Sequence, residues 1–267
     1  MRVLITGHNG FIGKNMLAWM AAEDWDVNGW TWKSNSFPDV SQYQWVIHLG
    51  AVTDPQYADI DKILERNFEF SQRLFNECQE HEVNLQYASC SSVYGVGKDF
   101  SETASPKPQS PYAWSKYLFD RWVFQQPINA SLVQGFRYFK VYGKYMHLSK
   151  KPNIMVRWKE QARKEGKITV WENAGFVRRD WVWVGDVCRL HIDFIKSVHG
   201  SGIWNCGSGL CHSYLDIAEE IASVENVPIE IISPAKISSP KVCADLTHLK
   251  STIGKRKWLN VFEYLNQ

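Results

Sequence analysis

A tyrosine and a lysine four residues apart, Tyr112 and Lys116, are the residues of this chain best suited to move a proton. Apolar spacing predicts a helix over residues 111–126, so both side chains project from one helical face. A phenol that loses its proton at about pH 10 is a poor base at neutral pH, but an adjacent ammonium stabilises the phenolate. We therefore predict that Tyr112 is a catalytic acid and base and that Lys116 lowers its pKa.

Three glycines, Gly7, Gly10 and Gly13, follow an apolar, β-branched run at residues 2–6 and precede helical periodicity at residues 14–22. Glycines between a strand and a helix let the backbone approach a pyrophosphate, which the first amides of the helix then bind. This context predicts a dinucleotide site, although three glycines can also serve an ordinary tight turn. We assign the whole turn to that site: Gly7, Asn9, Gly10, Phe11, Ile12 and Gly13.

The residues after the second predicted strand bear on the choice of dinucleotide. NAD-binding folds carry an acidic residue there for the ribose 2′-hydroxyl, whereas this chain has Lys33 and Ser34 and no acid among residues 29–35. A lysine and a serine suit a 2′-phosphate. We therefore predict NADP as the cofactor, with NAD possible, and the alternative for Lys33 is a solvated loop residue.

The elements that position these residues alternate between strand and helix. We expect strands at residues 2–6, 27–32, 45–49, 85–89 and 131–138, and helices at 14–22, 60–80 and 111–126. This alternation predicts an α/β protein with a Rossmann-type, doubly wound parallel sheet. After residue 143 we expect helices at 154–165 and 214–224, strands at 168–171, 176–184 and 228–232, and a helical piece around Val261.

These later elements predict a smaller C-terminal lobe that binds substrate. We expect an NADP-binding domain of residues 1–143 with 176–204, and a nucleotide-sugar-binding lobe of residues 144–175 with 205–267.

Composition favours small-molecule chemistry. The 267 residues are 45% hydrophobic, and 30 basic against 28 acidic side chains give a net charge of +2, which does not suggest a nucleic-acid or membrane surface. No apolar run is long enough for a membrane span, so we expect a cytoplasmic protein. Six cysteines without a CxxC pair support neither a metal site nor a disulfide framework, and we expect most of them in the core.

The glycine turn, the segment from Leu85 to Gly95 that ends in Ser-Ser-Val-Tyr-Gly, and the Tyr112/Lys116 pair occur in the order typical of one large family. The chain resembles the extended short-chain dehydrogenase/reductase family over nearly its whole length. Residues 48–51, 66–67, 112–120, 137–143, 178–187, 201–209 and 244–249 are most similar to its ADP-glyceromanno-heptose 6-epimerase branch.

This resemblance implies further site residues. Lys116 would bind the nicotinamide ribose, and Asn67 would support the part of the site that binds the cofactor. Arg179, before an Asp-aromatic-Val run, would bind the diphosphate of a nucleotide sugar, and its alternative is an ion pair with Asp180 or Asp186. The cofactor residues implied beyond the glycine turn are Leu49, Ala51 and Phe139.

The chain departs from the family pattern at two sites. Cys90 occupies the position of a serine or threonine that hydrogen-bonds the reacting oxygen, and a thiol is a weak donor. Ser92 or Ser91 can reach the same oxygen, and we assign Ser92 to catalysis and Ser91 to substrate binding. Lys140 replaces a neutral asparagine near the substrate phosphates, so it either tightens phosphate binding or marks another ligand.

An epimerase also needs a proton donor opposite Tyr112, since hydride returns to the other face of the carbonyl. The resemblance places a second catalytic lysine near Lys150. His147 and Lys151 are competitors, and an exposed cationic loop without a catalytic role is the other alternative.

Together these features predict a nucleotide-sugar epimerase that oxidises and re-reduces its substrate with tightly bound NAD(P). The alternatives are an NADPH-dependent keto-sugar reductase, a 4-epimerase, or a non-catalytic NADP-binding protein. Sugar 4,6-dehydratases need an Asp-Glu pair where this chain has Ser91 and Ser92. We also expect a homo-oligomer, because the helix after Tyr112 carries more aromatic residues than one buried stripe requires.

Overall fold

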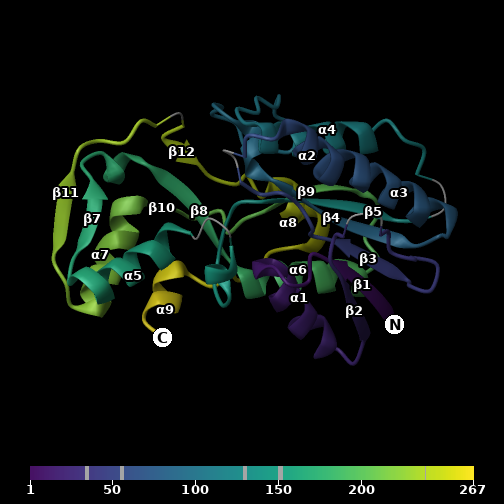
Figure 1. Ribbon diagram of the computed structural model, residues 1–267, viewed down its shortest axis with the longest axis horizontal. Helices are drawn as coiled ribbons and strands as arrows, with labels where there is room; N and C mark the ends of the chain where they lie inside the picture. Colours follow the sequence, from purple (N-terminus) through teal and green to yellow (C-terminus); the bar gives the residue numbers. More distant parts are fainter. Residues whose placement is uncertain (34–35, 55–56, 129–130, 150–152, 238) are drawn as a thin grey trace.

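A computed structural model describes residues 1–33, 36–54, 57–128, 131–149, 153–237 and 239–267 (Figure 1). Its larger part is a parallel sheet of six strands in the order β2-β1-β3-β4-β5-β9. These strands are β1 (Arg2–Thr6), β2 (Asp26–Trp30), β3 (Trp45–His48), β4 (Asn84–Cys90), β5 (Val133–Tyr138) and β9 (Gly202–Cys206). The order reverses between β1 and β3, which is where doubly wound sheets bind their ligands.

Helices cover both faces of this sheet (Figure 1). On one face lie α1 (Phe11–Ala21) and α6 (Val184–Lys196), and on the other α2 (Ile60–Leu64), α3 (Phe70–Glu80) and α4 (Pro111–Val123). Strand β1 shows why a strand covered on both faces is apolar at successive positions: Val3 and Ile5 pack in the cluster with α1 and α6, whereas Leu4 packs in the cluster with α3 and α4. The predicted fold class is confirmed.

The smaller part contains two short sheets. Strands β6 (Lys140–Tyr142), β8 (Arg178–Trp183), β10 (Cys211–Ser213) and β12 (Lys241–Val242) form one, and β7 (Ile168–Trp171) pairs with β11 (Ile229–Ile232) in the other. The helices here are α5 (Ile154–Glu165), α7 (Tyr214–Glu225) and α9 (Val261–Leu265), whereas α8 (Thr247–Ile253) packs against β9. Single 3₁₀ turns lie at Ser91–Tyr94, Met146–Leu148 and Ala174–Phe176.

Three strands cross the predicted division into domains, and β6 (Lys140–Tyr142) is the first, since residues 1–143 were expected in the NADP-binding part. Strand β8, which we expected in the NADP-binding part, pairs with β6, β10 and β12 of the smaller part. Strand β9 belongs to the six-stranded sheet, although residues 205–206 were expected in the lobe. The division itself therefore stays a prediction.

Two helical segments differ from their predictions. The single helix expected at residues 60–80 is continuous but contains a π-helical stretch, Glu65–Glu69, between α2 and α3. Helix α4 begins as predicted, since Ser110 caps it by accepting a hydrogen bond from the Ala113 amide at 3.2 Å and Pro111 follows, but it ends at Val123 instead of residue 126. These local signals fix its start, and with it the position of Tyr112 and Lys116.

The cysteines agree with the sequence only in part. Cys78, Cys90, Cys188 and Cys206 are buried, as expected of core residues. Cys211 and Cys243 form a disulfide, so the expectation of no disulfide is wrong for this pair. The two residues are 32 positions apart, and only the approach of β10 and β12 to β8 brings them together.

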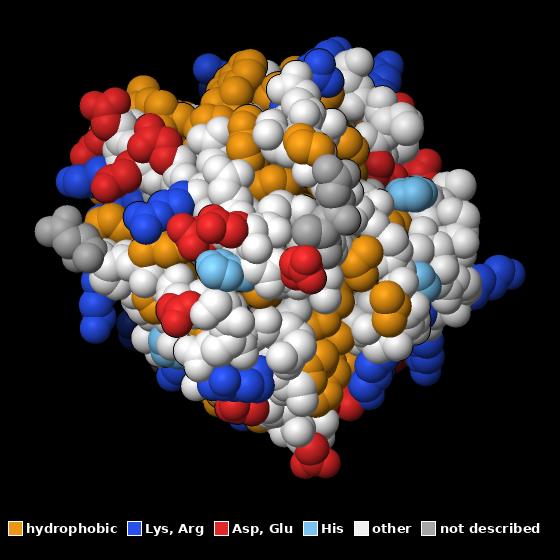
Figure 2. All heavy atoms as spheres, turned by 90° about the vertical axis from the view of Figure 1, so that its right-hand side faces the viewer, with side chains coloured by type: hydrophobic (Ala, Val, Ile, Leu, Met, Phe, Trp, Pro, Cys, Tyr) orange, Lys and Arg blue, Asp and Glu red, His pale blue; other side chains and the backbone are white. Residues whose placement is uncertain are grey.

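The surface beside β1, β3 and α3 shows acidic and basic side chains interspersed, as a net charge near zero suggests (Figure 2). Within the described ranges, no group of three His, Cys, Asp or Glu side chains is placed to hold a metal ion. Among the described helices, none has the length and apolarity that crossing a membrane requires.

Candidate active site

A cavity of about 1050 Å³ lies at the carboxyl ends of the central strands. It brings together most of the residues predicted from the sequence, from the glycine turn to the α4 helix and to strand β8. The predicted residues that line it are Gly7, Asn9, Gly10, Phe11, Ile12, Gly13, Leu49, Ala51, Cys90, Ser91, Ser92, Tyr112, Lys116, Phe139, Lys140 and Arg179.

The glycine turn has the shape that close approach to a phosphate requires. Gly7 has a φ of +73°, and a Cβ atom on Gly13 would lie only 2.2 Å from the Gly7 carbonyl oxygen. Gly10 precedes α1 without any side-chain cap, so the first amides of this helix are left for a ligand. The residues therefore fit the pyrophosphate of a dinucleotide.

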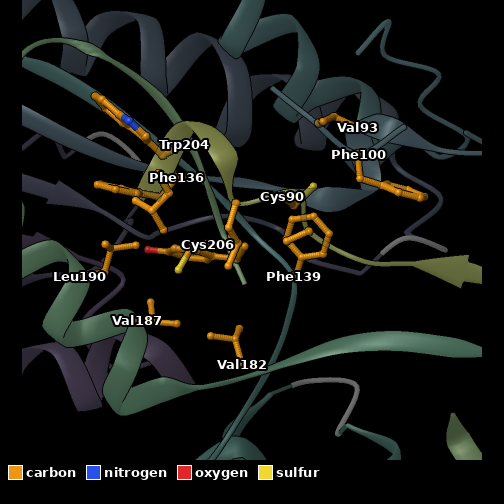
Figure 3. Packing of buried hydrophobic residues seen from close by; sticks show 14 of the residues in the cluster. Cys90, Val93, Phe100, Phe136, Phe139, Val182, Val187, Leu190, Trp204 and Cys206 are labelled. Carbon is orange, nitrogen blue, oxygen red and sulfur yellow. The ribbon is translucent and has the colours of Figure 1, made fainter. Parts of the chain in front are cut away.

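Tyr112, Lys116 and Cys90 meet where β4 ends and α4 begins. The Lys116 Nζ donates a hydrogen bond to the Ala88 carbonyl at 2.8 Å, and its side chain is buried. The Cys90 thiol interacts with the Tyr112 hydroxyl and with the Ser92 side chain. Cys90 and Phe139 belong to one packed apolar cluster (Figure 3). The thiol thus lies beside the phenol of Tyr112, in the cavity wall.

Burial dominates the ionisation of these groups. Burial raises the pKa of Tyr112 well above its ordinary value, and the Cys90 thiol and the Asp120 carboxylate add to this. Burial also raises the pKa of Cys90, while it lowers the pKa of Lys116. In the protein without cofactor, loss of water on burial therefore dominates the pKa of Tyr112, and the lowering of this pKa by Lys116 stays a prediction.

A buried ion pair joins the helix and strands that carry these residues. The Arg137 Nε donates to the Asp120 Oδ2 at 3.0 Å, and both side chains are at most 4% exposed. Asp120 also accepts from Ser89 at 2.9 Å, and Arg137 donates to the Tyr94 hydroxyl at 3.1 Å. The pair therefore ties α4 to the ends of β4 and β5.

Two neutral histidines hold polar residues of the cavity wall. His48 contacts the Thr6 hydroxyl at 2.7 Å and the Ser71 hydroxyl at 2.9 Å. The Ser71 hydroxyl donates its one hydrogen bond to the Asn67 carbonyl oxygen. His48 must therefore donate from Nε2 to Ser71 and accept at Nδ1 from Thr6.

His191 also bonds through both ring nitrogens, since its Nδ1 lies 2.7 Å from the Gln86 side-chain carbonyl oxygen and its Nε2 lies 2.6 Å from the Tyr138 hydroxyl. Its Nδ1 must therefore donate, because an amide oxygen only accepts. Thr6 and Tyr138, the partners of the two rings, both line the cavity.

Two of the basic residues that line the cavity are Arg179 and Lys140. Arg179 donates to the carbonyl oxygens of Arg178 and Pro240 at 2.8 and 3.3 Å, and in the described part of the chain it forms no ion pair with Asp180 or Asp186. Asp180 instead accepts hydrogen bonds from the Ser208, Gly209 and Ala244 amides. The guanidinium of Arg179 therefore keeps donors that suit a diphosphate.

Several predicted residues lie elsewhere. Lys33 is exposed and is not among the lining residues, and neither is the exposed His147. Asn67 does not face the cavity either: its side-chain oxygen accepts from the Val52 amide at 2.7 Å, and its nitrogen donates to Val52 and Ser115. Asn67 is thus linked to the cavity wall through Val52, and its role towards the cofactor stays a prediction. Ser34, Lys150 and Lys151 lie outside the described residues.

Sequence reasoning missed Trp32 and Arg66, which both line the cavity. The Arg66 guanidinium carbon lies 3.9 Å from the centre of the Trp32 ring. The absence of an acid after β2 directed attention to this region, but no sequence signal pairs Trp32 with a residue of the later π-helical segment.

Comparisons with known proteins agree with this geometry. A family model described as "NAD dependent epimerase/dehydratase family" matches residues 3–207. The chain is 35% identical over 181 residues to an ADP-L-glycero-D-manno-heptose-6-epimerase of Thiobacillus denitrificans, a match that spans 65% of this chain and only 54% of that protein. A Pseudomonas paraeruginosa protein of the same name is 30% identical over 252 residues, spanning 82% of this chain and 76% of its own length.

Solved structures share the fold. The structure of MoeE5 in complex with UDP-glucuronic acid and NAD has a TM-score of 0.86 and 23% identity, covering 99% of this chain and 96% of its own. The Helicobacter pylori ADP-L-glycero-D-manno-heptose-6-epimerase has a TM-score of 0.85 and 20% identity, covering 98% of this chain and 92% of its own. The family match covers well over half of the sequence. The chain therefore belongs to the NAD dependent epimerase/dehydratase family.

Proposed function

We propose that this protein is a nucleotide-sugar epimerase, of the kind that inverts C6 of an ADP-linked heptose. The observation that carries the proposal is that Tyr112, Lys116 and Cys90 share one cavity with the glycine turn and with Arg179. The similarity to proteins named ADP-L-glycero-D-manno-heptose-6-epimerase supports the choice of sugar.

A nicotinamide cofactor would supply a hydride acceptor that oxidises the carbinol carbon and returns the hydride, without net redox change. Amides of the glycine turn would hold its pyrophosphate. Lys116 has three donors, of which one is bonded to Ala88, so the others are available to the cofactor ribose. Its fixed positive charge would also favour proton loss from a hydroxyl beside it.

Tyr112 would take the proton of the substrate hydroxyl and later return it, with the Cys90 thiol and the Ser92 hydroxyl orienting the same oxygen. Arg179 and Lys140 would bind the diphosphate through charge-assisted hydrogen bonds. A second proton donor is needed on the opposite face, and Lys150 remains the proposed residue, with Lys151 the nearest competitor.

We also propose that the protein pairs with a second copy through α4. Trp114 on that helix and Phe124, the residue after its end, are 49% and 61% exposed. Two large apolar side chains at this exposure are unusual for a helix that faces only water.

The test is to incubate the protein with NADP and ADP-heptose and to follow the sugar by NMR and the cofactor by absorbance. Inverted C6 with unchanged cofactor supports the proposal. Stoichiometric NADPH consumption would indicate a keto-sugar reductase, inversion at C4 of another nucleotide sugar a 4-epimerase, and cofactor binding without any product a non-catalytic protein.

A further inference from the structure

Trp32 and Arg66 form a stacked pair in the wall of the cavity, beside the end of β2. The Arg66 guanidinium carbon lies 3.9 Å from the centre of the Trp32 ring, and Trp30 and Thr31 line the same region. A planar guanidinium at this distance is held over the indole by cation–π attraction. Stacking therefore fixes the cation without using its hydrogen-bond donors.

The backbone that carries Arg66 is also fixed. Arg66 lies in the π-helical stretch Glu65–Glu69, and the next residue, Asn67, is buried and bonded through its side chain to Val52 and Ser115. π-Helical turns within α-helices are frequent at functional sites, since the extra residue redirects the side chains around it. Here the stretch places Arg66 on Trp32, in the cavity wall.

The donors of Arg66 remain available for a ligand. Its Nε is buried and has no hydrogen-bond partner in the part of the chain that the structure describes. The nearby Asp59 carboxylate accepts from the Lys62 amide at 3.0 Å and pairs with the Lys62 ammonium at 3.1 Å. Of the acids that line the cavity, Asp54 follows β3 and Asp180 lies in β8, whereas NAD-binding folds place their ribose acid after β2.

We propose that Arg66, stacked on Trp32, binds the 2′-phosphate of the cofactor and selects NADP over NAD. This inference rests on the proposed function, because it assumes that a nicotinamide dinucleotide occupies the cavity. A guanidinium matches two phosphate oxygens with parallel N–H donors, which a lysine cannot do. Arg66 thereby replaces Lys33, which is exposed and outside the cavity lining.

The test measures the binding of two fragments, 2′,5′-ADP and 5′-ADP, by isothermal titration calorimetry, without any turnover. In Arg66→Ala, we expect the affinity for 2′,5′-ADP to fall roughly tenfold to a hundredfold, the range for a charge-assisted hydrogen bond, while that for 5′-ADP changes by less than about threefold. Lys33→Ala should leave both affinities unchanged.

Arg73→Ala is the matched control. Arg73 stacks on Phe37, also at 3.9 Å, but does not line the cavity, so its loss should leave both affinities unchanged. Thermal unfolding of each variant establishes that the comparison is made on folded protein.

Three results would overturn the inference: equal binding of the two fragments to the wild type, equal losses of both in Arg66→Ala, or a selective loss in Lys33→Ala or Arg73→Ala. If the wild type binds neither fragment, the proposed function fails as well. If 5′-ADP binds and the 2′-phosphate adds nothing, only the role of Arg66 fails.

Discussion

Lowering the pH from 7 to 5 should destabilise the protein through His48 and His191. Burial lowers the pKa of each imidazole from 6.5 to about 3, and the nearby Lys116 contributes at His48. Each ring is therefore neutral in the folded protein, whereas it gains a proton below pH 6.5 once the chain unfolds. The stability that the two neutral rings contribute is fully present above pH 6.5 and is lost as the pH falls towards 3.

The size of the effect follows from these two shifts. Between pH 7 and pH 5, proton uptake by an unfolded histidine favours unfolding by about 2 kcal/mol, so the pair lowers the free energy of unfolding by about 4 kcal/mol. That is a large fraction of the roughly 5–15 kcal/mol by which domains are stable. Burial raises the pKa values of Asp120 and Asp180, so these carboxyl groups take up protons more readily in the folded protein than in the unfolded chain. At lower pH they therefore oppose the destabilisation by the histidines, and the measurement stops at pH 5.

The assay is urea unfolding at pH 7, 6 and 5, followed by tryptophan fluorescence. His48→Gln and His191→Gln should each remove about half of the pH dependence, while His81→Gln, at an exposed position, should leave it unchanged. A free energy of unfolding that is constant from pH 7 to pH 5, or a pH dependence as large in both variants as in the wild type, would refute the reasoning.

Three further predictions concern the site and its support. Tyr112→Phe should abolish turnover while NADP binding and the melting temperature stay near wild type, and near-normal turnover would exclude Tyr112 as the acid and base. Cys90→Ser should raise turnover roughly twofold to tenfold, because a hydroxyl forms a stronger hydrogen bond than a thiol, and an equal or lower rate would show that the chain is adapted to the thiol. Asp120→Asn should cost about 3–5 kcal/mol in urea unfolding, because it leaves Arg137 buried without its partner. Asp26→Asn, at an exposed ion pair, should cost less than about 1 kcal/mol, and equal losses would contradict this account.

The parts of the fold and site that the sequence predicts are those set by local signals. The glycine turn, the capped start of α4 and the apolar strands are each determined within a few residues. Once these elements are placed, the parallel sheet brings the ends of β1 and β4 to one edge, and Tyr112, Cys90 and Gly7 meet there.

What the sequence does not predict depends on contacts between distant segments. Helix α6 was not predicted from the sequence. Nearly all of its residues are buried, and it begins directly after β8, with no polar residues between the strand and the helix. The disulfide of Cys211 and Cys243 and the stacking of Arg66 on Trp32 depend on tertiary approach. The direction of the Tyr112 pKa also depends on burial, which spacing along a helix does not reveal.

The central claim is that one bound cofactor removes a hydride and returns it to the opposite face of the same carbon. The most direct measurement is a turnover with ADP-heptose deuterated at C6, followed by NMR and mass spectrometry of sugar and cofactor. We predict an inverted product that retains the deuterium on C6, with no label in free NADPH. Loss of the label to solvent, or its accumulation in free cofactor with a ketone or reduced product, would contradict the account.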